Sequence, residues 1–248
     1  MKRLAAILCA CALAVTASPE AAAQRVTLLC NSASHGAVEE LRAMVSAQAH
    51  VQLDTECGST AEGLARVNRG DAVDVIVTTR DAIVDLQARG LVGSRTDLGI
   101  SDVGIAVGDQ APLPALESKE DFVAFMRNLP TLGYTTGASG QHPDRVFDAL
   151  GLTDVMKPKS TVVEGGGAAK LLTAGRVAAA VQQVGELGVD GARNVVPLPE
   201  AVQMHTMLAI AILSRAPHAD AAAATVLVLT SPPAIPVFQR WGLQPAFR

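Results

Sequence analysis

The sequence predicts an α/β fold of two similar lobes, with mixed, mostly parallel sheets joined by two hinge crossings. Short segments rich in β-branched residues alternate with segments of helical pattern, which is typical of parallel sheets. A unit of small-residue loop, helix, glycine and buried strand occupies residues 58–79 and recurs at residues 165–184. Apolar runs near 103–107 and 206–213 flank the second half, so we expect them to be the two crossings.

This organisation divides the chain into a leader and two lobes. The expected parts are a signal peptide at residues 1–23, a first lobe at residues 24–105 plus 203–248, and a second lobe at residues 106–202. Strands are expected where β-branched and apolar residues cluster between turn residues. In chain order these segments are 26–30, 51–56, 73–78, 103–107, 131–135, 160–163, 177–182, 194–197 and 206–213.

Helix starts are marked by capping residues. Ser59-Thr60-Ala61-Glu62 is a capping box, in which the serine hydroxyl and the glutamate carboxylate satisfy unpaired backbone N–H groups, and Gly70 ends that helix. Further helices are expected to begin at Asp81 and Ser118 as caps, at Pro143 in a first turn, and at Ser231-Pro232.

The composition excludes several classes of protein. Of the 248 residues, 49% are apolar and 18% are charged, which is too apolar for a disordered chain. Aromatic residues make up only 3%, which argues against a carbohydrate-binding protein or a protein that binds single-stranded nucleic acid, because both classes stack their ligands on aromatic side chains. A net charge of −4 without a basic stripe makes nucleic acid or an anionic membrane an unfavourable partner.

The N-terminal segment has the pattern of a secretory signal peptide. Lys2 and Arg3 precede a short apolar run, Leu4 to Val15, and Ala21-Ala22-Ala23 offers a small-residue cleavage site. The run is too short to span a bilayer. We therefore expect an exported, soluble mature chain cleaved near Ala23. The alternative is a lipoprotein signal with Cys11 as the anchor.

Two cysteines remain after cleavage at that site. Cys30 and Cys57 each end an apolar segment, so on neighbouring parallel strands both thiols would lie at the same edge and could form a bridge. Such a bridge would contribute roughly 3 kcal/mol to stability. The alternative is two separate buried thiols. Two cysteines and five scattered histidines show no metal-ligand spacing, so no metal site is expected.

Small polar residues follow the predicted strands in both halves. In α/β sheets, ligands bind beyond the carboxyl ends of strands, and helix N-termini there attract anions. Glycine allows close backbone approach, and hydroxyl groups add hydrogen-bond donors. The sequence therefore predicts a small-anion site in a cleft between the lobes. The candidate residues on these grounds are Ser32, Ser34, Ser59, Thr60, Thr79, Ala138, Ser139, Gly140 and Gly166.

Catalytic motifs are weak in this sequence. Residues 137–140 are not a nucleophile elbow, because no residue separates Ser139 from Gly140. Residues 164–167 match neither a P-loop nor a dinucleotide fingerprint, so no cofactor is predicted. His35 and His142 each lie beside a candidate loop and could act as acid or base, or could simply be solvated residues at helix starts.

Several segments carry a resemblance to a known family. They are Arg25–Leu29, Gly70–Val77, Gly93–Gly99 with the following 103–107, Ser139-Gly140, Val181–Leu187 and Leu229–Pro232. Together they make essentially the whole mature chain resemble periplasmic substrate-binding proteins of the molybdate-binding type, which have a two-lobed type II fold. The resemblance implies a periplasmic monomer that binds a small anion and delivers it to the membrane subunit of an ABC transporter.

The resemblance also assigns site residues. The ligand loops of the family fall on Ser32, Ser59, Ala138, Ser139 and Gly166, whereas Gln182 stands where molybdate binders have a tyrosine. This departure weakens the case for molybdate. The pattern Gln182-Gln183 with Glu186 is closer to a divergent branch similar to aconitate isomerase, which the resemblance implies needs no cofactor.

These observations support a leading hypothesis and two alternatives. The leading hypothesis is a solute-binding protein that closes on an oxyanion or carboxylate. The first alternative is an isomerase that interconverts trans- and cis-aconitate by allylic proton transfer, with His142, His35 or Glu164 as the base. Cations near the loops would then hold the carboxylates; the candidates are Arg80, Arg145 and Lys170. The second alternative is a sensor or chaperone-like binding module.

Overall fold

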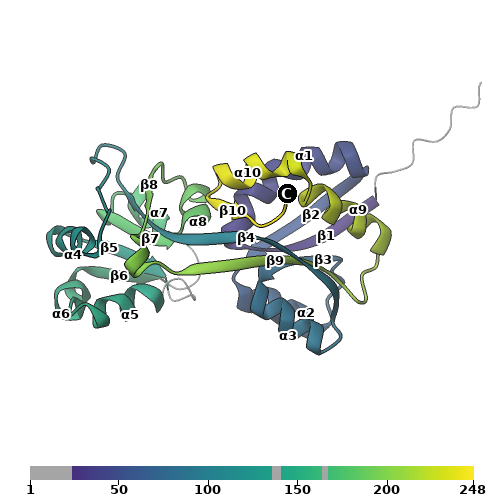
Figure 1. Ribbon diagram of the computed structural model, residues 1–248, viewed down its shortest axis with the longest axis horizontal. Coiled ribbons are helices and arrows are strands. Elements are labelled where there is room, and N and C mark those ends of the chain that lie inside the picture. The colour runs from purple at the N-terminus through teal and green to yellow at the C-terminus, as the bar shows by residue number, and fades with distance from the viewer. Residues whose placement is uncertain (1–23, 136–140, 164–166) are drawn as a thin grey trace, which may run out of the picture.

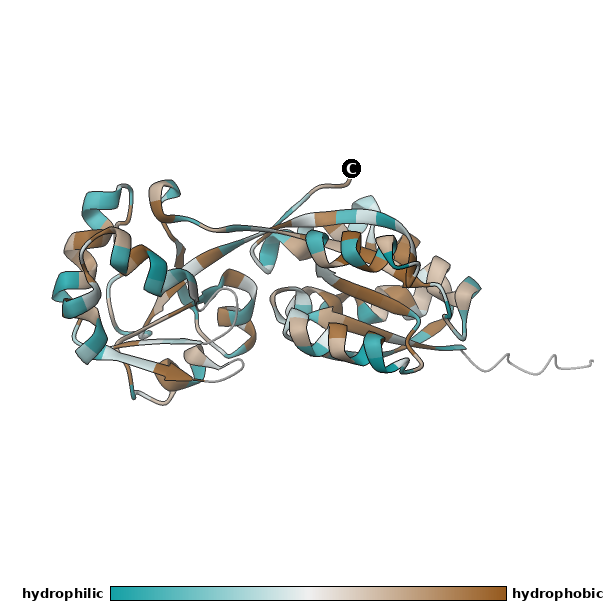
Figure 2. Cartoon of the chain, turned by 90° about the horizontal axis from the view of Figure 1, so that it is seen from below, coloured by the Kyte–Doolittle hydropathy of each residue, from teal (hydrophilic) through white to brown (hydrophobic). Residues whose placement is uncertain are grey.

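The computed structural model describes residues 24–135, 141–163 and 167–248, which form two lobes lying side by side (Figure 1). The expected signal peptide and Cys11 lie outside the described residues. Figure 2 shows extended strands joining the lobes along one edge. The predicted α/β class, with two lobes and mixed, mostly parallel sheets, is confirmed.

The first lobe is built on three parallel strands extended by antiparallel ones. The order is β2-β1-β3, after which β9 pairs antiparallel with β3, β4 with β9, and β10 with β4. Both faces of β1 are covered, which explains why Val26, Leu28 and Leu29 are all apolar. The bounds are β1 Gln24–Asn31, β2 Val51–Gly58, β3 Val75–Thr79, β4 Val92–Val107, β9 His205–Leu213 and β10 Leu243–Pro245.

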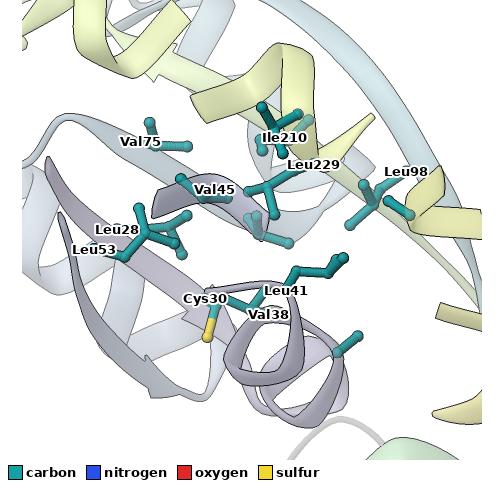
Figure 3. Close-up of a cluster of buried hydrophobic side chains, with 14 of the residues drawn as sticks. Leu28, Cys30, Val38, Leu41, Val45, Leu53, Val75, Leu98, Ile210 and Leu229 are labelled. Carbon is teal, nitrogen blue, oxygen red and sulfur yellow. The ribbon is translucent and has the colours of Figure 1, made fainter. Parts of the chain in front are cut away.

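Helices pack on both faces of this sheet. Because side chains alternate along a strand, Leu28 lies in one apolar cluster and Leu29 in another. Figure 3 shows the first cluster, in which Leu28 packs with Leu41 of α1 and Leu229 of α9. The second cluster holds α2 and α3. The bounds are α1 His35–Ala49, α2 Thr60–Arg69, α3 Arg80–Ala88, α9 Ala219–Leu229 and α10 Ile235–Arg240, with 3-10 turns η1 Ser32–Ser34 and η4 Pro232–Ala234.

The second lobe repeats the plan on a smaller sheet. β5 pairs in parallel with β6 and β7, and the last part of β4 pairs antiparallel with β7 and β8. Phe122, Met126 and Phe147 fill the core beside it. The bounds are β5 Leu132–Thr135, β6 Ser160–Val163, β7 Ala179–Gln183, β8 Asn194–Pro197, α4 Lys119–Asn128, α5 Gln141–Ala149, α6 Thr153–Met156, α7 Ala168–Thr173 and α8 Val184–Val189, with 3-10 turns η2 Lys157–Lys159 and η3 Glu200–Val202.

The nine predicted strands all form, but their ends differ. β3 begins at Val75 rather than at residue 73, and β4 begins at Val92 rather than at residue 103. The early part of β4 is rich in polar and glycine residues, because much of it faces solvent, and this hid it from an analysis of apolar runs. The short strand β10 was not predicted.

One of the predicted helix caps needs correction. The cap of α3 is Thr79, whose Oγ1 accepts a hydrogen bond from the Ala82 N–H at 3.4 Å, and Asp81 lies inside the first turn. Ser231-Pro232 opens the last helical segment as predicted, since η4 begins at Pro232 and leads into α10, but the Ser231 hydroxyl makes no capping hydrogen bond and donates to the Val228 carbonyl oxygen instead. The capping box at Ser59 and the cap at Ser118 are confirmed, and Asp121 completes a second capping box at Ser118.

The two crossings lie close together. β4 pairs with β9 as far as Asp102 and with β7 from Val103 onward, so it passes from one sheet to the other between these residues (Figure 1). β9 pairs with strands of the first lobe along its length, and therefore the return crossing precedes it. The predicted crossing at 206–213 is thus displaced to the residues just before His205.

Side chains reinforce the joint at the crossings. The amide of Gln203 accepts from the Val103 N–H at 2.8 Å and donates to the Val103 carbonyl oxygen at 3.0 Å, which replaces one rung of a strand ladder. Next to it, His205 Nδ1 lies 2.6 Å from Asp102 Oδ1. Hydrogen bonds to Glu200 and then Asp102 raise the pKa of His205. Together these side chains tie the two crossing segments to each other.

A second contact between the lobes depends on glycine. A Cβ atom at Gly185, on α8 of the second lobe, would overlap the carbonyl oxygen of Ala33 in the first lobe. The ring of Trp241 lies beside Gly188 of the same helix and against Gly36 of α1. The missing side chains therefore let the backbone of α8 approach the first lobe directly.

No single helix of the described residues is long and apolar enough to cross a membrane. One pair, Ala219–Leu229 with Pro232–Arg240, meets the length and composition test only when counted together across a bend of 60°. Residues of both helices, among them Leu229 and Phe238, lie buried in the first lobe.

The disulfide between Cys30 and Cys57 is present, and it decides between the two alternatives left by the sequence. The two residues are register partners on β1 and β2, with their Cα atoms 4.4 Å apart. The bridge joins the carboxyl ends of these strands, and Cys57 lines the cleft described below.

Removing the bridge should destabilise the first lobe. For the double variant Cys30→Ala with Cys57→Ala, we expect a free energy of unfolding lower by about 3–4 kcal/mol, because the closed loop restricts the unfolded chain. Urea unfolding of both proteins measures this difference. Equal unfolding midpoints would contradict a structural role for the bridge.

Substituting Gly185 should disturb the contact between the lobes. We expect Gly185→Ala to lower the free energy of unfolding by about 1–3 kcal/mol, because the added methyl overlaps the Ala33 backbone. Gly63→Ala is the matched control on α2, where a Cβ atom would meet its nearest neighbour at 3.8 Å. It should raise stability by up to about 1 kcal/mol. Similar effects of both variants in urea unfolding would contradict the contact.

Candidate functional site

A cleft of about 800 Å³ lies between the lobes. It is formed where strands of both sheets end and helices begin, as the sequence predicts. From the first lobe the lining includes Asn31, Ser32, His35, Gly58, Ser59, Thr60, Glu62 and Thr79. From the second lobe it includes Thr135, Gly167, Lys170, Gln182, Gln183, Glu186, Val189 and Asp190. Thr206, near the return crossing, completes the lining at the hinge.

Neutral donors line the first-lobe wall in a fixed arrangement. Asn31 Nδ2 donates to Thr60 Oγ1 at 3.1 Å, and the Thr78 hydroxyl donates to the same oxygen at 3.2 Å. Asn31 Oδ1 accepts from the Ala33 N–H at 3.0 Å, which fixes the orientation of its amide. These groups are therefore oriented before any ligand binds, which lowers the entropic cost of binding.

The N-terminus of α2 already holds a carboxylate of the chain itself. Glu62 Oε2 accepts from the Ser59 N–H at 2.7 Å and from the Ser59 hydroxyl at 2.8 Å. These hydrogen bonds hold the pKa of Glu62 below its usual range, so the group is ionised at neutral pH. Ser59 lies in the cleft as predicted, but its hydroxyl proton is directed to Glu62 rather than to the open space.

The second-lobe wall presents two glutamine amides. Gln182 Oε1 accepts from the Ala169 N–H at the start of α7 at 3.1 Å, and its Nε2 donates to Glu186 Oε2 at 2.8 Å. Gln183 is only 5% exposed, and its amide makes no hydrogen bond to any residue that the structure describes. Its amide is therefore the best-placed donor for a ligand on this wall.

Glu186 is the titratable group of this wall with the largest change in acidity. Burial is the main cause, and it raises the pKa of Glu186 to about 7, with a further contribution from the nearby charge of Asp190. The hydrogen bond from Gln182 acts in the opposite direction. A carboxyl group of this kind exchanges its proton near neutral pH, as acid–base chemistry requires.

The other predicted site residues are divided among several places. Ser32, His35 and Thr79 line the cleft. Ser34 is fully buried, and its hydroxyl donates to the Asn31 carbonyl oxygen. His142 is not among the lining residues; its Nε2 lies 2.8 Å from the Val202 carbonyl oxygen, and burial lowers its pKa. The remaining candidates lie outside the described residues: Ala138, Ser139, Gly140, Glu164 and Gly166.

Positive charge is scarce on the described walls. Lys170 is the one lysine or arginine among the described lining residues, and its Nζ lies 3.5 Å from Asp190 Oδ1. Arg80 and Arg145 are exposed on α3 and α5 and do not line the cleft. Within the described ranges, no group of three His, Cys, Asp or Glu side chains is placed to hold a metal ion.

A smaller pocket of about 360 Å³ adjoins the cleft beside α2. It shares Asn31, Gly58 and Ser59 with the cleft and has the disulfide in its lining. Arg66, which also lines it, is held by Glu56 and by Asp71, whose Oδ2 lies 2.6 Å from the Arg66 Nε. Its positive charge is thus already paired.

Sequence reasoning did not select Asn31, Asp190 or Thr206 as site residues, although all three line the cleft. Asn31 belongs to the polar stretch that directly follows the first predicted strand, so the sequence did mark its position. Asp190 lies one turn after Glu186, so the helical spacing of α8 was the available signal. Thr206 reaches the cleft through the displaced return crossing, which no local pattern marks.

Two lobes on separate sheets, joined by adjacent crossings and enclosing a polar cleft, define the class of two-lobed solute-binding proteins. Residues 26–244 match the family model described as bacterial extracellular solute-binding protein. The chain belongs to this family.

Three relatives illustrate the range of proteins that are similar to this chain. An aconitate isomerase from a Pseudomonas species is 28% identical in an alignment 246 residues long, which covers 94% of this chain and 94% of that protein. The Azotobacter vinelandii periplasmic molybdate-binding protein has the same fold, with a TM-score of 0.72 and 16% identity over 88% of this chain and 98% of that one. Campylobacter jejuni PEB3 with L-phospholactate bound gives a TM-score of 0.64 and 15% identity, over 88% and 99% of the two chains.

The raised pKa of Glu186 makes stability depend on pH. The folded state holds this proton up to about pH 7, whereas the group loses it near 4.5 in the unfolded chain. Stability contributed by Glu186 is therefore present below pH 4.5 and is lost as the pH rises through about 7. We expect Glu186→Gln to be more stable than the unmodified chain at pH 8, by at most about 3 kcal/mol, and similar to it at pH 4.

Urea unfolding at several pH values measures this effect. Glu117→Gln is the matched control, because Glu117 is exposed and outside the cleft, and it should leave the pH dependence unchanged. A constant difference between Glu186→Gln and the unmodified chain from pH 4 to pH 8 would contradict the assignment.

Proposed function

We propose that this chain is a periplasmic solute-binding protein that closes its two lobes on a small anion, and that the anion is a carboxylate rather than a metal oxyanion. The cleft carries the proposal: neutral donors such as Asn31, Thr60 and Gln183 face a space of about 800 Å³ from both lobes. Neutral donors bind an anion well when they are oriented in advance and shielded from water.

Two relatives support a carboxylate ligand over a metal oxyanion. The relative named for aconitate, a tricarboxylate, is more similar in sequence to this chain than the molybdate-binding protein is. PEB3 with L-phospholactate gives further support for an organic anion.

Closure would connect binding to transport. In this proposal, residues 24–105 with 203–248 move as one unit and residues 106–202 as the other, about the crossings beside Asp102 and Gln203. Closing the lobes buries the ligand and creates a surface that the membrane subunit of an ABC transporter recognises. The mature chain acts as an exported monomer without a cofactor.

The aconitate isomerase relative supports a second candidate function. Isomerisation of trans- to cis-aconitate removes a proton from one carbon, shifts the double bond and returns a proton to another carbon, so atoms balance without a cofactor. A base that reaches both carbons is required. His35 lines the cleft and therefore remains a candidate for this base. His142 does not line the cleft, and its Nε2 contacts the Val202 carbonyl oxygen.

A thermal-shift screen of oxyanions and di- and tricarboxylates tests the ligand class. A ligand present at 100 times its Kd should stabilise the protein by about 2.7 kcal/mol. Gln183→Ala should weaken binding by about 10- to 100-fold, because a buried donor is lost, whereas Gln239→Ala on the exposed side of α10 should not. Stabilisation by molybdate alone would contradict the carboxylate proposal, and equal affinity in both variants would contradict the role of Gln183 as a donor.

A second experiment, isotope exchange in D₂O, distinguishes a binding protein from an enzyme. trans-Aconitate incubated with the protein in D₂O remains unlabelled if the protein only binds it. Conversion to cis-aconitate with deuterium incorporation, followed by proton NMR, would establish the second candidate.

A further inference from the structure

We propose that binding of the anion is coupled to the uptake of one proton by Glu186, which then donates a hydrogen bond to the bound ligand. The proposal rests on the proposed function, since it requires that the cleft bind an anion. It adds a proton to the binding reaction: an ionised protein and an ionised ligand combine with one H⁺ from solution, and no bond of the ligand breaks.

The position of Glu186 is the first argument. Its side chain lines the cleft from α8, and one carboxyl oxygen, Oε2, accepts the hydrogen bond from Gln182. Gln182 is itself anchored to Ala169, so the carboxyl group is held in one orientation. The other oxygen, Oε1, makes no hydrogen bond to any residue in the described part of the chain and is available to a ligand.

The charges around Glu186 are the second argument. On its own helix the neighbouring charge is Asp190, which is negative and is paired with Lys170 of α7. α1 contributes His35 to the cleft, and Glu62 faces the same space from α2. β7, β8 and the second-lobe part of β4 contain no titratable side chain. Among the described residues, no cation is paired with Glu186.

Binding of an anion further favours the protonated form of Glu186 over the ionised form. A second negative charge and the exclusion of water both disfavour the ionised form of Glu186, so ligand binding raises the affinity of this carboxyl for a proton. Without the proton, the ligand would face an unpaired carboxylate. With it, the same side chain becomes a donor aimed at the anion. Burial already raises the pKa of Glu186 to about 7, so this proton lies within the neutral range.

The expected consequence is a pH-dependent affinity. When only the protonated fraction of the protein binds, the apparent affinity falls in proportion to that fraction. Above pH 7 it should therefore fall by about tenfold for each pH unit, whereas below pH 6 it should be nearly constant. Glu186→Gln mimics the neutral form, so its affinity should resemble that of the unmodified chain at low pH and stay constant as the pH rises.

Calorimetry of the mature chain tests this coupling. trans-Aconitate and sodium molybdate serve as probes at pH 6 and pH 8, and the titrations at pH 8 are carried out in Tris and in HEPES, two buffers with different ionisation enthalpies. The difference in binding heat between buffers at pH 8 gives the number of protons taken up. The carboxyl groups of trans-aconitate are ionised at this pH and contribute none. We expect close to one proton for the unmodified chain and for Glu117→Gln, and none for Glu186→Gln.

The outcomes separate the two proposals. Binding of a probe without proton uptake at pH 8, or the same loss of affinity with pH in Glu186→Gln as in the unmodified chain, overturns the coupling and leaves the proposed function intact. Absence of binding of both probes at pH 6, where Glu186 carries its proton, overturns the proposed function and the coupling with it.

Discussion

β4 supplies hydrogen-bond partners to two sheets, and this sharing determines where the two walls of the cleft lie. Up to Asp102 its partners are β9 and β10, and from Val103 onward its partners are β7 and β8. The strand is closely covered at the transition, where a Cβ atom at Gly104 would meet Val184 at 2.9 Å. The lobes are thus joined at a short joint that the Gln203 amide and the Asp102–His205 pair hold together.

The two walls use different chemistry for the same task. The first-lobe wall presents hydroxyl and amide groups that are fixed by one another, and the positive end of α2 is neutralised by Glu62. The second-lobe wall presents amides and a carboxyl group whose charge depends on burial. An anion between them meets donors on both sides, and a proton taken up with it would offset one unit of its negative charge.

Much of the fold follows from local patterns that act over a few residues. The strand segments, the capping boxes at Ser59 and Ser118, and the shared edge of Cys30 and Cys57 are properties of the chain within one or two elements. The early part of β4 escaped notice because a strand with one solvent-facing side and several glycines lacks an apolar run. Register with β9, which is more than 100 residues away, holds it in place.

The candidate site was predictable to a smaller extent. Strand-end residues such as Ser32, Thr60 and Thr79 do line the cleft, because the edge of a parallel sheet collects them. The hydrogen bonds of the serines at these strand ends were not predictable. The Ser34 hydroxyl is buried and donates to the Asn31 carbonyl oxygen, and the Ser59 hydroxyl donates to Glu62. The altered acidity of Glu186 arises from its packing in three dimensions, which no spacing in the sequence encodes.

Trp241 is the single tryptophan of the chain, and it lies where α8 of the second lobe meets α1 of the first. Its indole N–H donates to Glu40 Oε2 at 2.8 Å, and its ring lies beside Gly188. Indole emission responds to polarity and to nearby groups, so any separation of the lobes at this contact changes the surroundings of the one residue that dominates near-ultraviolet absorption and emission. The protein therefore contains an intrinsic fluorophore at the contact between α8 and α1, and its conformational state can be followed spectroscopically without attaching a dye.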